Sequence, residues 1–380
     1  MSHALVLGAG MVGSVMAFDL ARHGYRVTIA DANPDNLARA SSRDAARITP
    51  ARADLSDPAA IASLASTADV VLGALPSRLG FAAMRAVIES KRHYCDISFM
   101  TEDFESLDAL AKSKGVTIIA DCGVAPGMSH ILSAHGSRLL DTCHAIEIYV
   151  GGLPRERRWP FEYKAAFAPA DVIEEYTRPS RLVEHGQVVT REALSEPELM
   201  DFPGVGTLEA FNTDGLRSLT TSLRVPFMKE KTLRYPGHIA LMRAMRETGL
   251  FSLDPIDVKG QRVVPRELTS ALLFPKWTYQ PGEADLTVMR VMARGLKGNT
   301  PTTHTWDLFD VYDPDTNCTS MARTTAFPAT IVAGLLASGR FREPGVHPPE
   351  RLATDPGLVE TLLAQLASRG VRYVHTLTQP

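Results

Sequence analysis

The sequence predicts an α/β protein in which an N-terminal, doubly wound parallel sheet carries an inserted α+β domain and a C-terminal helix that returns to the first domain. Two observations lead to this prediction. From residue 4 to residue 121, short apolar runs alternate with segments of helical periodicity, and no repeat or low-complexity segment interrupts them. Beyond Cys122, residues that alternate between apolar and polar dominate, as in antiparallel strands.

The first segment contains a glycine motif between a strand and a helix. Residues 4–7 are apolar, as in a buried parallel strand, and residues 8–13 then read G-x-G-x-x-G ahead of helical periodicity over residues 14–22. In a Rossmann fold the three glycines permit a tight turn, the approach of a pyrophosphate to the backbone, and close packing of helix on strand. The unpaired N–H groups of the helix then face the phosphates. The sequence therefore predicts a dinucleotide site with contacts from Gly8, Gly10, Met11, Val12 and Gly13.

The residue that ends the second strand bears on the choice of cofactor. Residues 25–30 are typical of a strand, and Asp31 follows them, where an acidic residue accepts hydrogen bonds from the adenosine ribose. Its carboxylate would repel a 2′-phosphate, and neither Ala32 nor Asn33 supplies a cation to bind one. The sequence therefore favours NAD over NADP.

The rest of the alternation predicts four more parallel strands, and hence a six-stranded sheet. These strands are expected at residues 47–53, 68–75, 94–97 and 116–121, and helices at residues 34–41, 58–66, 81–90 and 107–114. Because the carboxyl ends of parallel strands border the cofactor, further contacts are expected there. They are Asp54 and Leu55 beside the adenine, and Ala74, Leu75, Pro76 and Gly123 at the ends of later strands.

The chain is expected to divide into three parts. A dinucleotide-binding domain covers residues 1–127, a substrate-binding and dimerisation domain covers residues 128–319, and a C-terminal segment, residues 320–380, packs back on the first domain. Residues 285–313 predict a hairpin with residues 295–301 as its loop. Helices are expected near residues 129–139, 169–176, 238–248, 265–273, 321–338 and 358–368.

Length, charge and cysteine content exclude several classes of protein. The 380 residues suffice for two domains, and a net charge of −3 does not indicate a partner such as nucleic acid or a membrane surface. No apolar run approaches the roughly 20 residues of a membrane span, and no signal peptide precedes the first strand, so we expect a cytoplasmic protein. The four cysteines include no C-x-x-C pair, so we expect reduced thiols and no metal site.

Several motifs along the chain point to one known family. They are the glycine motif with Asp31, followed by residues 121–128 (DCGVAPGM), 149–152 (YVGG), 162–163 (EY), 208–213 (LEAFNT), 234–238 (RYPGH) and 321–326 (MARTTA). With these motifs the chain resembles the saccharopine dehydrogenase-like family over essentially its whole length, and most closely its bacterial lysine 6-dehydrogenases. Saccharopine reductases of the family tend to carry acidic residues where this chain has Ala125 and Ser129, and this difference favours the lysine 6-dehydrogenase branch.

The resemblance implies NAD-dependent oxidation of the terminal primary amine of L-lysine. The product is an imine that hydrolyses to the semialdehyde, releases ammonia and can close to a cyclic imine. The resemblance also implies a homodimer formed through the second domain, or a dimer of such dimers.

Such a reaction needs a proton acceptor, because lysine's ammonium is protonated at neutral pH and must lose a proton before hydride leaves. Asp96 and Asp121 follow apolar strands and are expected to face the cofactor cleft. Tyr163 and His238, from the second domain, are the other acid/base candidates. Each has a structural alternative, which is a helix cap or structural hydrogen bond for the aspartates and a core or interface position for the other two.

The α-carboxylate of lysine calls for an arginine or for backbone donors. Arg323 lies on the helix that is expected to return to the cleft and is the first candidate. Arg234 is the second, with a surface ion pair as its alternative. Asn212 and Thr213 follow a strand at a turn, where small polar side chains either bind a ligand or stabilise the turn.

Three functions therefore stay open. The first is an amine dehydrogenase that acts on lysine or a close relative. The second is reductive condensation of an amine with a carbonyl compound, as in saccharopine or carboxynorspermidine formation, although Asp31 disfavours its NADPH. The third is an NAD-binding sensor or scaffold without catalysis, which the polar groups at Asp96, Asp121, Tyr163 and His238 disfavour.

Overall fold

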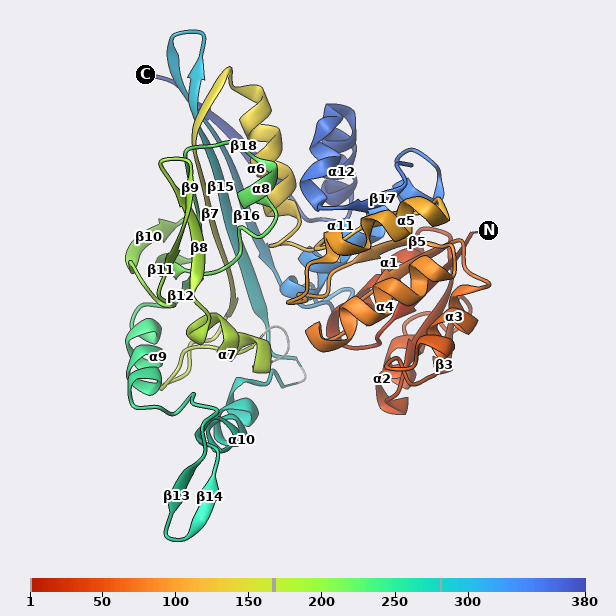
Figure 1. Ribbon diagram of the computed structural model, residues 1–380, viewed down its shortest axis with the longest axis horizontal. Helices are drawn as coiled ribbons and strands as arrows, with labels where there is room; N and C mark the ends of the chain where they lie inside the picture. The colour runs from red at the N-terminus through yellow and green to blue at the C-terminus, as the bar shows by residue number, and fades with distance from the viewer. Residues whose placement is uncertain (1, 166–168, 281) are drawn as a thin grey trace. The chain divides into compact units, whose positions relative to one another are not determined.

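The computed structural model describes residues 2–165, 169–280 and 282–380, which form two compact units (Figure 1). Unit 1 contains the chain up to His135 together with Ala322–Arg372. Unit 2 contains Gly136–Met321 and Tyr373–Pro380. The chain leaves unit 1 within helix α6 (Met128–Leu139) and returns within helix α11 (Ser320–Ala337).

Within the described residues, unit 1 holds a parallel sheet of seven strands in the order β17-β6-β5-β4-β1-β2-β3. The strands are β1 (His3–Leu7), β2 (Arg26–Asp31), β3 (Ile48–Arg52), β4 (Val70–Gly73), β5 (His93–Asp96), β6 (Thr117–Ile119) and β17 (Gly345–His347). Every residue of β1 and β4 is buried, which explains their continuous apolar runs. At the edge, β3 tolerates Pro50 because a strand there needs hydrogen bonds on one side only.

The predicted six-stranded sheet is one strand short. Residues that follow α11 form β17, whose Val346 pairs with Ile118 of β6 in parallel register. A strand of three residues carries too little alternation to be recognised in the sequence. The parallel α/β fold itself is as predicted.

Three helices of unit 1 begin at a polar side chain that caps them. They are α1 (Met11–Arg22), α2 (Pro34–Ser41), α3 (Pro58–Ala65), α4 (Ser77–Glu89), α5 (Asp108–Lys114) and α12 (Pro356–Ser368), with short 3₁₀ turns at Phe104–Leu107 and Pro349–Thr354. Asn33, Asp57 and Asp355 each accept a hydrogen bond from the backbone N–H two residues on, and a proline follows each of them. A side-chain acceptor followed by proline is a strong start signal, and the predicted boundaries of α2 and α3 are accordingly close.

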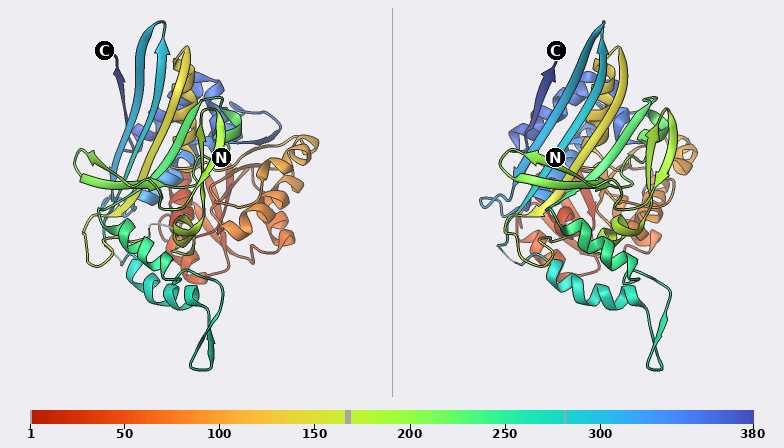
Figure 2. Two further views of the ribbon diagram at one scale, coloured as in Figure 1. Left: turned by 60° about the vertical axis from the view of Figure 1, so that its left-hand side comes forward. Right: turned by 90° about the vertical axis from the view of Figure 1, so that its left-hand side faces the viewer.

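Unit 2 is built on a mixed sheet that comprises nine strands in the described part of the chain. Its main path runs β10 (Glu198–Phe202), β11 (Gly206–Asn212), β12 (Phe227–Arg234), β7 (Thr142–Pro154), β15 (Asp285–Lys297), β16 (Thr300–Val311) and β18 (Tyr373–Thr378). Strand β8 (Ser180–Glu184) joins β12 and pairs with β9 (Gln187–Arg191). Figure 2 shows the long strands β7, β15 and β16 side by side.

The remaining elements of unit 2 are four helices in the described residues and a small two-stranded hairpin. The helices are α7 (Pro169–Thr177), α8 (Leu219–Ser222), α9 (His238–Glu247) and α10 (Pro265–Trp277), and the hairpin strands are β13 (Ile256–Val258) and β14 (Gln261–Val263). A cluster of buried aromatic and aliphatic side chains fills the space near α7, α9 and α10, and includes Tyr163, Tyr176, Phe211 and Trp277.

The predicted loop of the β15–β16 hairpin is too long. Lys297 pairs with Thr300, so Gly298 and Asn299 form the connection, and residues 295–297 and 300–301 belong to the strands. Gly298 has a φ of 57°, which a two-residue hairpin turn with glycine in its first position requires.

The end of the chain also differs from the prediction. Residues 320–380 were expected to pack as one segment on the first domain, but β18 pairs with β16 in unit 2, with His375 opposite Trp306. Residues 373–378 add a strand to the open edge of β16, and this pairing satisfies backbone groups that would otherwise be unpaired.

A buried carboxylate caps the N-terminus of α11. Asp285, which is fully buried, accepts hydrogen bonds from the backbone N–H groups of Ser320 at 2.6 Å and of Met321 at 2.9 Å. The hydroxyl of Ser320 donates to Asp310 at 2.7 Å. A negative charge at this end of a helix is favourable, so Asp285 ties the start of α11 to β15. In the chain as described, no helix combines the length and apolarity that crossing a bilayer requires.

We predict that Asp285→Ala lowers the free energy of unfolding by about 2–3 kcal/mol, because two buried N–H groups lose a charged acceptor. Urea titration followed by tryptophan fluorescence reports on unit 2, which contains all three tryptophans. The control is Asp307→Ala on the neighbouring strand, which removes a half-exposed pair with Arg290 and should cost under about 1 kcal/mol. Equal losses in the two variants would contradict the capping role.

Candidate functional site

The glycine loop between β1 and α1 depends on backbone contacts that only glycine allows. Gly8 has a φ of 99°, and a Cβ there would lie 2.4 Å from the carbonyl oxygen of Ala74. A Cβ on Gly13 would lie 1.9 Å from the carbonyl oxygen of Gly8. By contrast, a Cβ on Gly10 would meet no described atom within 4 Å. The first and third glycines therefore serve packing, and the second leaves open space at the start of the helix.

The N-terminus of α1 fits the diphosphate of a dinucleotide. Gly10 is the N-cap, no side chain of the described chain caps it, and the first turn contains no acidic residue. The N–H groups of Met11, Val12 and Gly13 belong to this first turn, where backbone donors and the helix dipole favour an anion. The open space at Gly10 is where such an anion would approach.

Asp31 lies at the carboxyl end of β2, beside the glycine loop. Its Oδ2 accepts a hydrogen bond from the N–H of Ala9 at 2.7 Å, and its Oδ1 accepts one from Asn33 at 2.8 Å. These bonds fix the carboxylate at the loop and leave further lone pairs for a ribose hydroxyl.

Sequence reasoning missed a cation close to Asp31. Arg52, an exposed residue at the end of β3, stands opposite Asp31 in the parallel register of β2 and β3. Arg52 is 21 residues from Asp31 in the sequence, and only the register of β2 and β3 brings the two residues opposite each other. A guanidinium at this position is able to bind a phosphate, so the strand pair presents one anion and one cation at the same edge.

The other predicted cofactor contacts differ in exposure. Ala74 and Leu75 border Gly8, Pro76 is exposed, and Gly123 is buried against Thr325. Asp54 is exposed and accepts hydrogen bonds from Ser56. Leu55 is buried in the core of unit 1.

Two aspartates meet at the carboxyl ends of β5 and β6. Asp96 is fully buried and accepts hydrogen bonds from the hydroxyl of Tyr94 at 2.9 Å and from the hydroxyl and N–H of Ser98 at 3.0 and 3.1 Å. Burial and the nearby charge of Asp121 raise the pKa of Asp96 and these donors lower it, with a net rise to about 7. The N–H of Cys122 donates to the carbonyl of Asp96 at 2.8 Å, which joins the two strand ends.

A glycine makes room for this carboxyl group. A Cβ on Gly73, the last residue of β4, would lie 1.9 Å from the hydroxyl of Tyr94 and 2.1 Å from Asp96. Asp121 is itself buried and has a φ of 52°, a conformation that aspartate adopts more readily than most residues. The edge of unit 1 thus holds a carboxyl group that can gain or lose a proton near neutral pH.

Tyr163, His238 and Arg234 come together in unit 2, in the buried aromatic cluster. The guanidinium of Arg234 pairs with Glu175 at 2.7 Å and lies over the ring of Tyr163 at 4.4 Å. With 2% of its surface exposed, Arg234 does not form the surface ion pair that was its predicted alternative. Burial raises the pKa of Tyr163, so its hydroxyl stays protonated at neutral pH.

His238 is neutral in this cluster. Its Nδ1 donates to the carbonyl of Phe161 at 2.9 Å, and its Nε2 accepts from the hydroxyl of Tyr176 at 2.9 Å. Burial, together with the charge of Arg234, lowers the pKa of His238 to about 3. Both ring nitrogens thus have structural partners.

Asn212 and Thr213 are buried at the end of β11. The amide of Asn212 donates to Ser195 at 3.2 Å, and the hydroxyl of Thr213 bonds with that of Thr232 at 3.0 Å. Glu230, which sequence reasoning missed, is buried nearby, and its backbone carbonyl accepts from Thr213. Burial raises the pKa of Glu230 to about 8. The trace of Glu230 in the sequence is the glycine that follows Asp214, because a Cβ on that glycine would overlap the carboxyl group of Glu230.

Arg323 belongs to unit 1, near the start of α11. Its guanidinium lies beside the backbone of Gly370, 2.9 Å from where a Cβ would stand, and 6.0 Å from the ring of Phe327. The cysteines are free thiols, of which Cys95, Cys122 and Cys318 are buried. Among the residues that the structure covers, no group of three His, Cys, Asp or Glu side chains is arranged to hold a metal ion.

Comparison with known families and proteins shows the family of the chain. Residues 4–119 match the model of the saccharopine dehydrogenase NADP binding domain, and residues 123–371 match that of the saccharopine dehydrogenase C-terminal domain. The chain belongs to the saccharopine dehydrogenase family. The solved structure of apo saccharopine dehydrogenase (L-Glu forming) from Saccharomyces cerevisiae has the same fold, with a TM-score of 0.82, 17% identity and 100% of both chains covered.

Two curated relatives indicate the range of activities in the family. The chain is 26% identical to mitochondrial alpha-aminoadipic semialdehyde synthase of Bos taurus, over 82% of this chain and 41% of that protein. It is 22% identical to carboxyaminopropylagmatine dehydrogenase of Synechocystis sp., over 71% of this chain and 67% of that protein. The chain spans less than half the length of the semialdehyde synthases that it matches.

We predict that Gly10→Ala weakens NAD(P) binding at least tenfold without lowering the unfolding temperature. The added methyl group meets open space, where it would stand between the helix N-terminus and a diphosphate. Gly13→Ala is the matched comparison, and it should lower the unfolding temperature because its methyl group would overlap the carbonyl of Gly8. Titration of each variant with NAD and NADP, beside thermal unfolding, measures both effects. Unchanged affinity in Gly10→Ala would rule out a diphosphate at this loop.

Proposed function

We propose that this chain is an NAD-dependent amine dehydrogenase that oxidises the terminal primary amine of L-lysine or a close relative. The amine carbon loses a hydride and the nitrogen loses a proton, so the substrate becomes an imine. Water hydrolyses the imine to the semialdehyde and ammonia, and the semialdehyde closes onto the α-amine as a cyclic imine. Membership of the family supports the redox class, and the substrate is our inference from Ala125 and Ser129, which replace acidic residues typical of saccharopine reductases.

The glycine loop, the N-terminus of α1 and Asp31 would hold the cofactor. Bound NAD supplies the acceptor for the hydride. Asp31 supports NAD, because its carboxylate would share the ribose edge with a 2′-phosphate and repel it. Arg52 is the residue that would favour NADP instead, so the balance of Asp31 and Arg52 decides the preference.

The buried carboxyl group of Asp96 is the observation that best supports the amine chemistry. A base that works at neutral pH needs a pKa near 7, and burial brings the pKa of Asp96 to about 7. The group lies at the carboxyl edge of the parallel sheet, where a doubly wound fold binds its ligands. We therefore assign to Asp96 the acceptance of the ammonium proton, and to Asp121 the orientation of the amine.

The α-carboxylate of the substrate needs a cation. Arg323, near the start of α11 in unit 1, is our first candidate for this contact, and Arg234, which pairs with Glu175 in unit 2, is the second. We place Tyr163 and His238 in a supporting role, because their hydrogen bonds and ring contacts hold the aromatic cluster of unit 2 together. We also propose that the protein assembles through unit 2 as a homodimer or a dimer of dimers.

Reductive condensation of an amine with a carbonyl compound is the second candidate. The relatives support it, since the chain is similar to a saccharopine dehydrogenase and to a carboxyaminopropylagmatine dehydrogenase. In that reaction the same edge of unit 1 would bind the cofactor, and Asp96 would donate a proton instead of accepting one.

A single assay separates the candidates. Purified protein is mixed with NAD or NADP and L-lysine, other diamines or amino acids at alkaline pH, and NAD(P)H is followed by absorbance. NADH formation with lysine alone is the expected result. A parallel mixture contains NADPH, an amine and an aldehyde or keto acid, and consumption of NADPH only when both partners are present would favour condensation. Binding of NAD with no turnover of any substrate would indicate a sensor.

Asp96→Asn is expected to lower kcat about 100-fold and to abolish the rise in kcat centred near pH 7, because the amide cannot accept the proton. His238→Asn is the control. Since the pKa of His238 is about 3, His238 does not titrate between pH 5 and pH 8, and its variant should keep the shape of the pH profile. A pH profile of kcat that changes in His238→Asn but not in Asp96→Asn would show that the base lies in unit 2.

The same carboxyl group predicts a dependence of stability on pH. The pKa of Asp96 is raised in the folded protein, so the folded state binds the proton more tightly than the unfolded chain does. The resulting stabilisation is complete below about pH 4, and it is lost as the pH rises to about 7. Relative to Asp96→Asn, the parent protein should therefore lose up to about 4 kcal/mol between pH 4 and pH 7. Urea titrations of both proteins at several pH values test this, and a constant difference would show that the pKa of Asp96 is not raised in the folded protein.

Asp31→Ala should weaken NAD binding about tenfold and bring the affinity for NADP closer to that for NAD. The carboxylate is lost as an acceptor, and the cation of Arg52 remains at the same edge. Asp35→Ala is a matched control, because it removes an equal charge from an exposed position four residues further on. Equal effects of the two variants would show that net charge, not contact with the ribose, sets the preference.

A further inference from the structure

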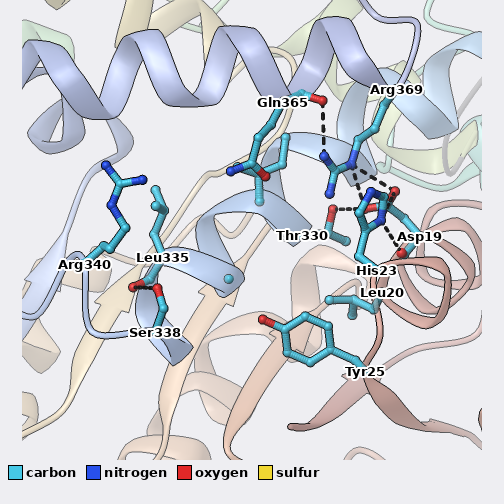
Figure 3. Close-up of a pocket in the computed structure, with 12 residues that line it drawn as sticks. Asp19, Leu20, His23, Tyr25, Thr330, Leu335, Ser338, Arg340, Gln365 and Arg369 are labelled. Carbon is cyan, nitrogen blue, oxygen red and sulfur yellow. Dashed lines mark hydrogen bonds and ion pairs between the residues drawn. The ribbon is translucent and has the colours of Figure 1, made fainter. Parts of the chain in front are cut away.

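Unit 1 contains a cavity that the proposed reaction does not use. It has a volume of about 200 Å³ and lies between the C-terminal end of α1, the second half of α11 and the end of α12 (Figure 3). The glycine loop is at the other end of α1, about 15 Å away along the helix axis. The cavity is therefore separate from the cofactor site.

One wall of the cavity is apolar. Leu20, Ile331 and Leu335 line it, and each exposes 3% of its surface or less. Gly334 lies in the same lining, and a Cβ there would stand 3.6 Å from the hydroxyl of Tyr25, at ordinary contact distance. An engineered cavity of about 150 Å³ takes up benzene, so this one has room for a ring or a short alkyl chain with a polar group attached.

The opposite wall carries a charged network, shown by dashed lines in Figure 3. Asp19 accepts hydrogen bonds from Arg369 at 3.0 Å and from Thr330 at 2.5 Å, and it pairs with His23 at 3.2 Å. Burial raises the pKa of Asp19, but His23 and Arg369 outweigh this effect and lower it overall. The carboxylate is therefore ionised and already surrounded by donors of the protein itself.

The donors that remain give the cavity a positive character. Arg369 uses Nε for Asp19 and Nη1 for the carbonyl of Gln365, and its Nη2 has no hydrogen-bond partner in the described part of the chain. Within the same residues, Tyr25 makes no hydrogen bond through its hydroxyl, and Arg340 makes one long bond to Thr361 at 3.4 Å. The hydrogen bond to Asp19 raises the pKa of His23. Arg369 and this histidine thus face the carboxylate of Asp19, whereas Arg340 lies at the other end of the lining, near Leu335 and Ser338 (Figure 3).

We propose that this cavity binds a small organic carboxylate whose apolar part is about the size of a benzene ring. The apolar wall would take up the ring or chain, and Arg369 Nη2 and the hydroxyl of Tyr25 would bind the carboxylate. A charge-assisted contact with a guanidinium makes the site selective for an anion over a neutral or cationic molecule of the same shape. The inference does not depend on the proposed dehydrogenase activity.

The test uses 4-fluorobenzoate as the probe, with ¹⁹F NMR and calorimetric titration of the full chain. 4-Fluorobenzamide and 4-fluorobenzylamine have almost the same shape but are neutral and cationic. We expect 4-fluorobenzoate to bind at least tenfold more tightly than either. No binding of 4-fluorobenzoate, or equal binding of the three molecules, would overturn the proposal.

Variants locate the site. Gly334→Met fills the cavity without a backbone clash and should abolish binding of 4-fluorobenzoate, and Tyr25→Phe, which removes a proposed donor, should weaken it about tenfold. Ala364→Met is the matched control, since it adds the same side chain at an exposed position of α12 outside the lining. Thermal unfolding checks that each variant is folded. Binding that survives in a folded Gly334→Met, or that is lost equally in Ala364→Met, would place the carboxylate elsewhere.

Discussion

The contact between the backbones of Gly8 and Gly13 determines how unit 1 is built. The first turn of α1 approaches β1 so closely that a single methyl group on Gly13 would overlap the carbonyl of Gly8. Gly8 in turn lies against the carbonyl of Ala74, which fixes the end of β4 beside the same loop. Because these contacts leave no freedom for side chains, the N-terminus of the helix is held at the carboxyl edge of the sheet. A methyl group on Gly10, by contrast, would meet no described atom within 4 Å, so the open space of the motif lies at Gly10.

Burial has different effects on the ionisable groups of the two units. Asp96 has neutral hydrogen-bond donors around it and the charge of Asp121 nearby, so its two protonation states are close in free energy at neutral pH. His238 is equally buried, but the cation of Arg234 disfavours its protonated form. Arg234 keeps its charge because Glu175 lies 2.7 Å away. Burial in a low dielectric therefore makes Asp96 suited to proton transfer and makes His238 suited to a fixed hydrogen-bond pattern.

Features with a strong local signal could be predicted from the sequence. The apolar runs of β1 and β4 and the capped starts of α2 and α3 depend on neighbouring residues alone, and their positions agree with the structure. Strand β17 and the pairing of β18 depend on partners that are more than 60 residues away in the chain. The residues of the candidate site also fall into a group with a local signal in the sequence and a group without one. The glycine motif and Asp31 are visible locally, whereas Arg52 requires the register of two strands and Glu230 requires knowledge of what packs over the glycine after Asp214.

The position of β17 at the edge of the unit 1 sheet has a consequence for biosynthesis. The backbone groups of β6 that pair with β17 are made by the ribosome more than 200 residues before their partner. During that interval a nascent chain would expose an unpaired parallel edge, which is a site for wrong pairing with other chains. The order of synthesis therefore makes the early half of unit 1 dependent on protection, by a chaperone or by temporary contacts, until the late segment arrives.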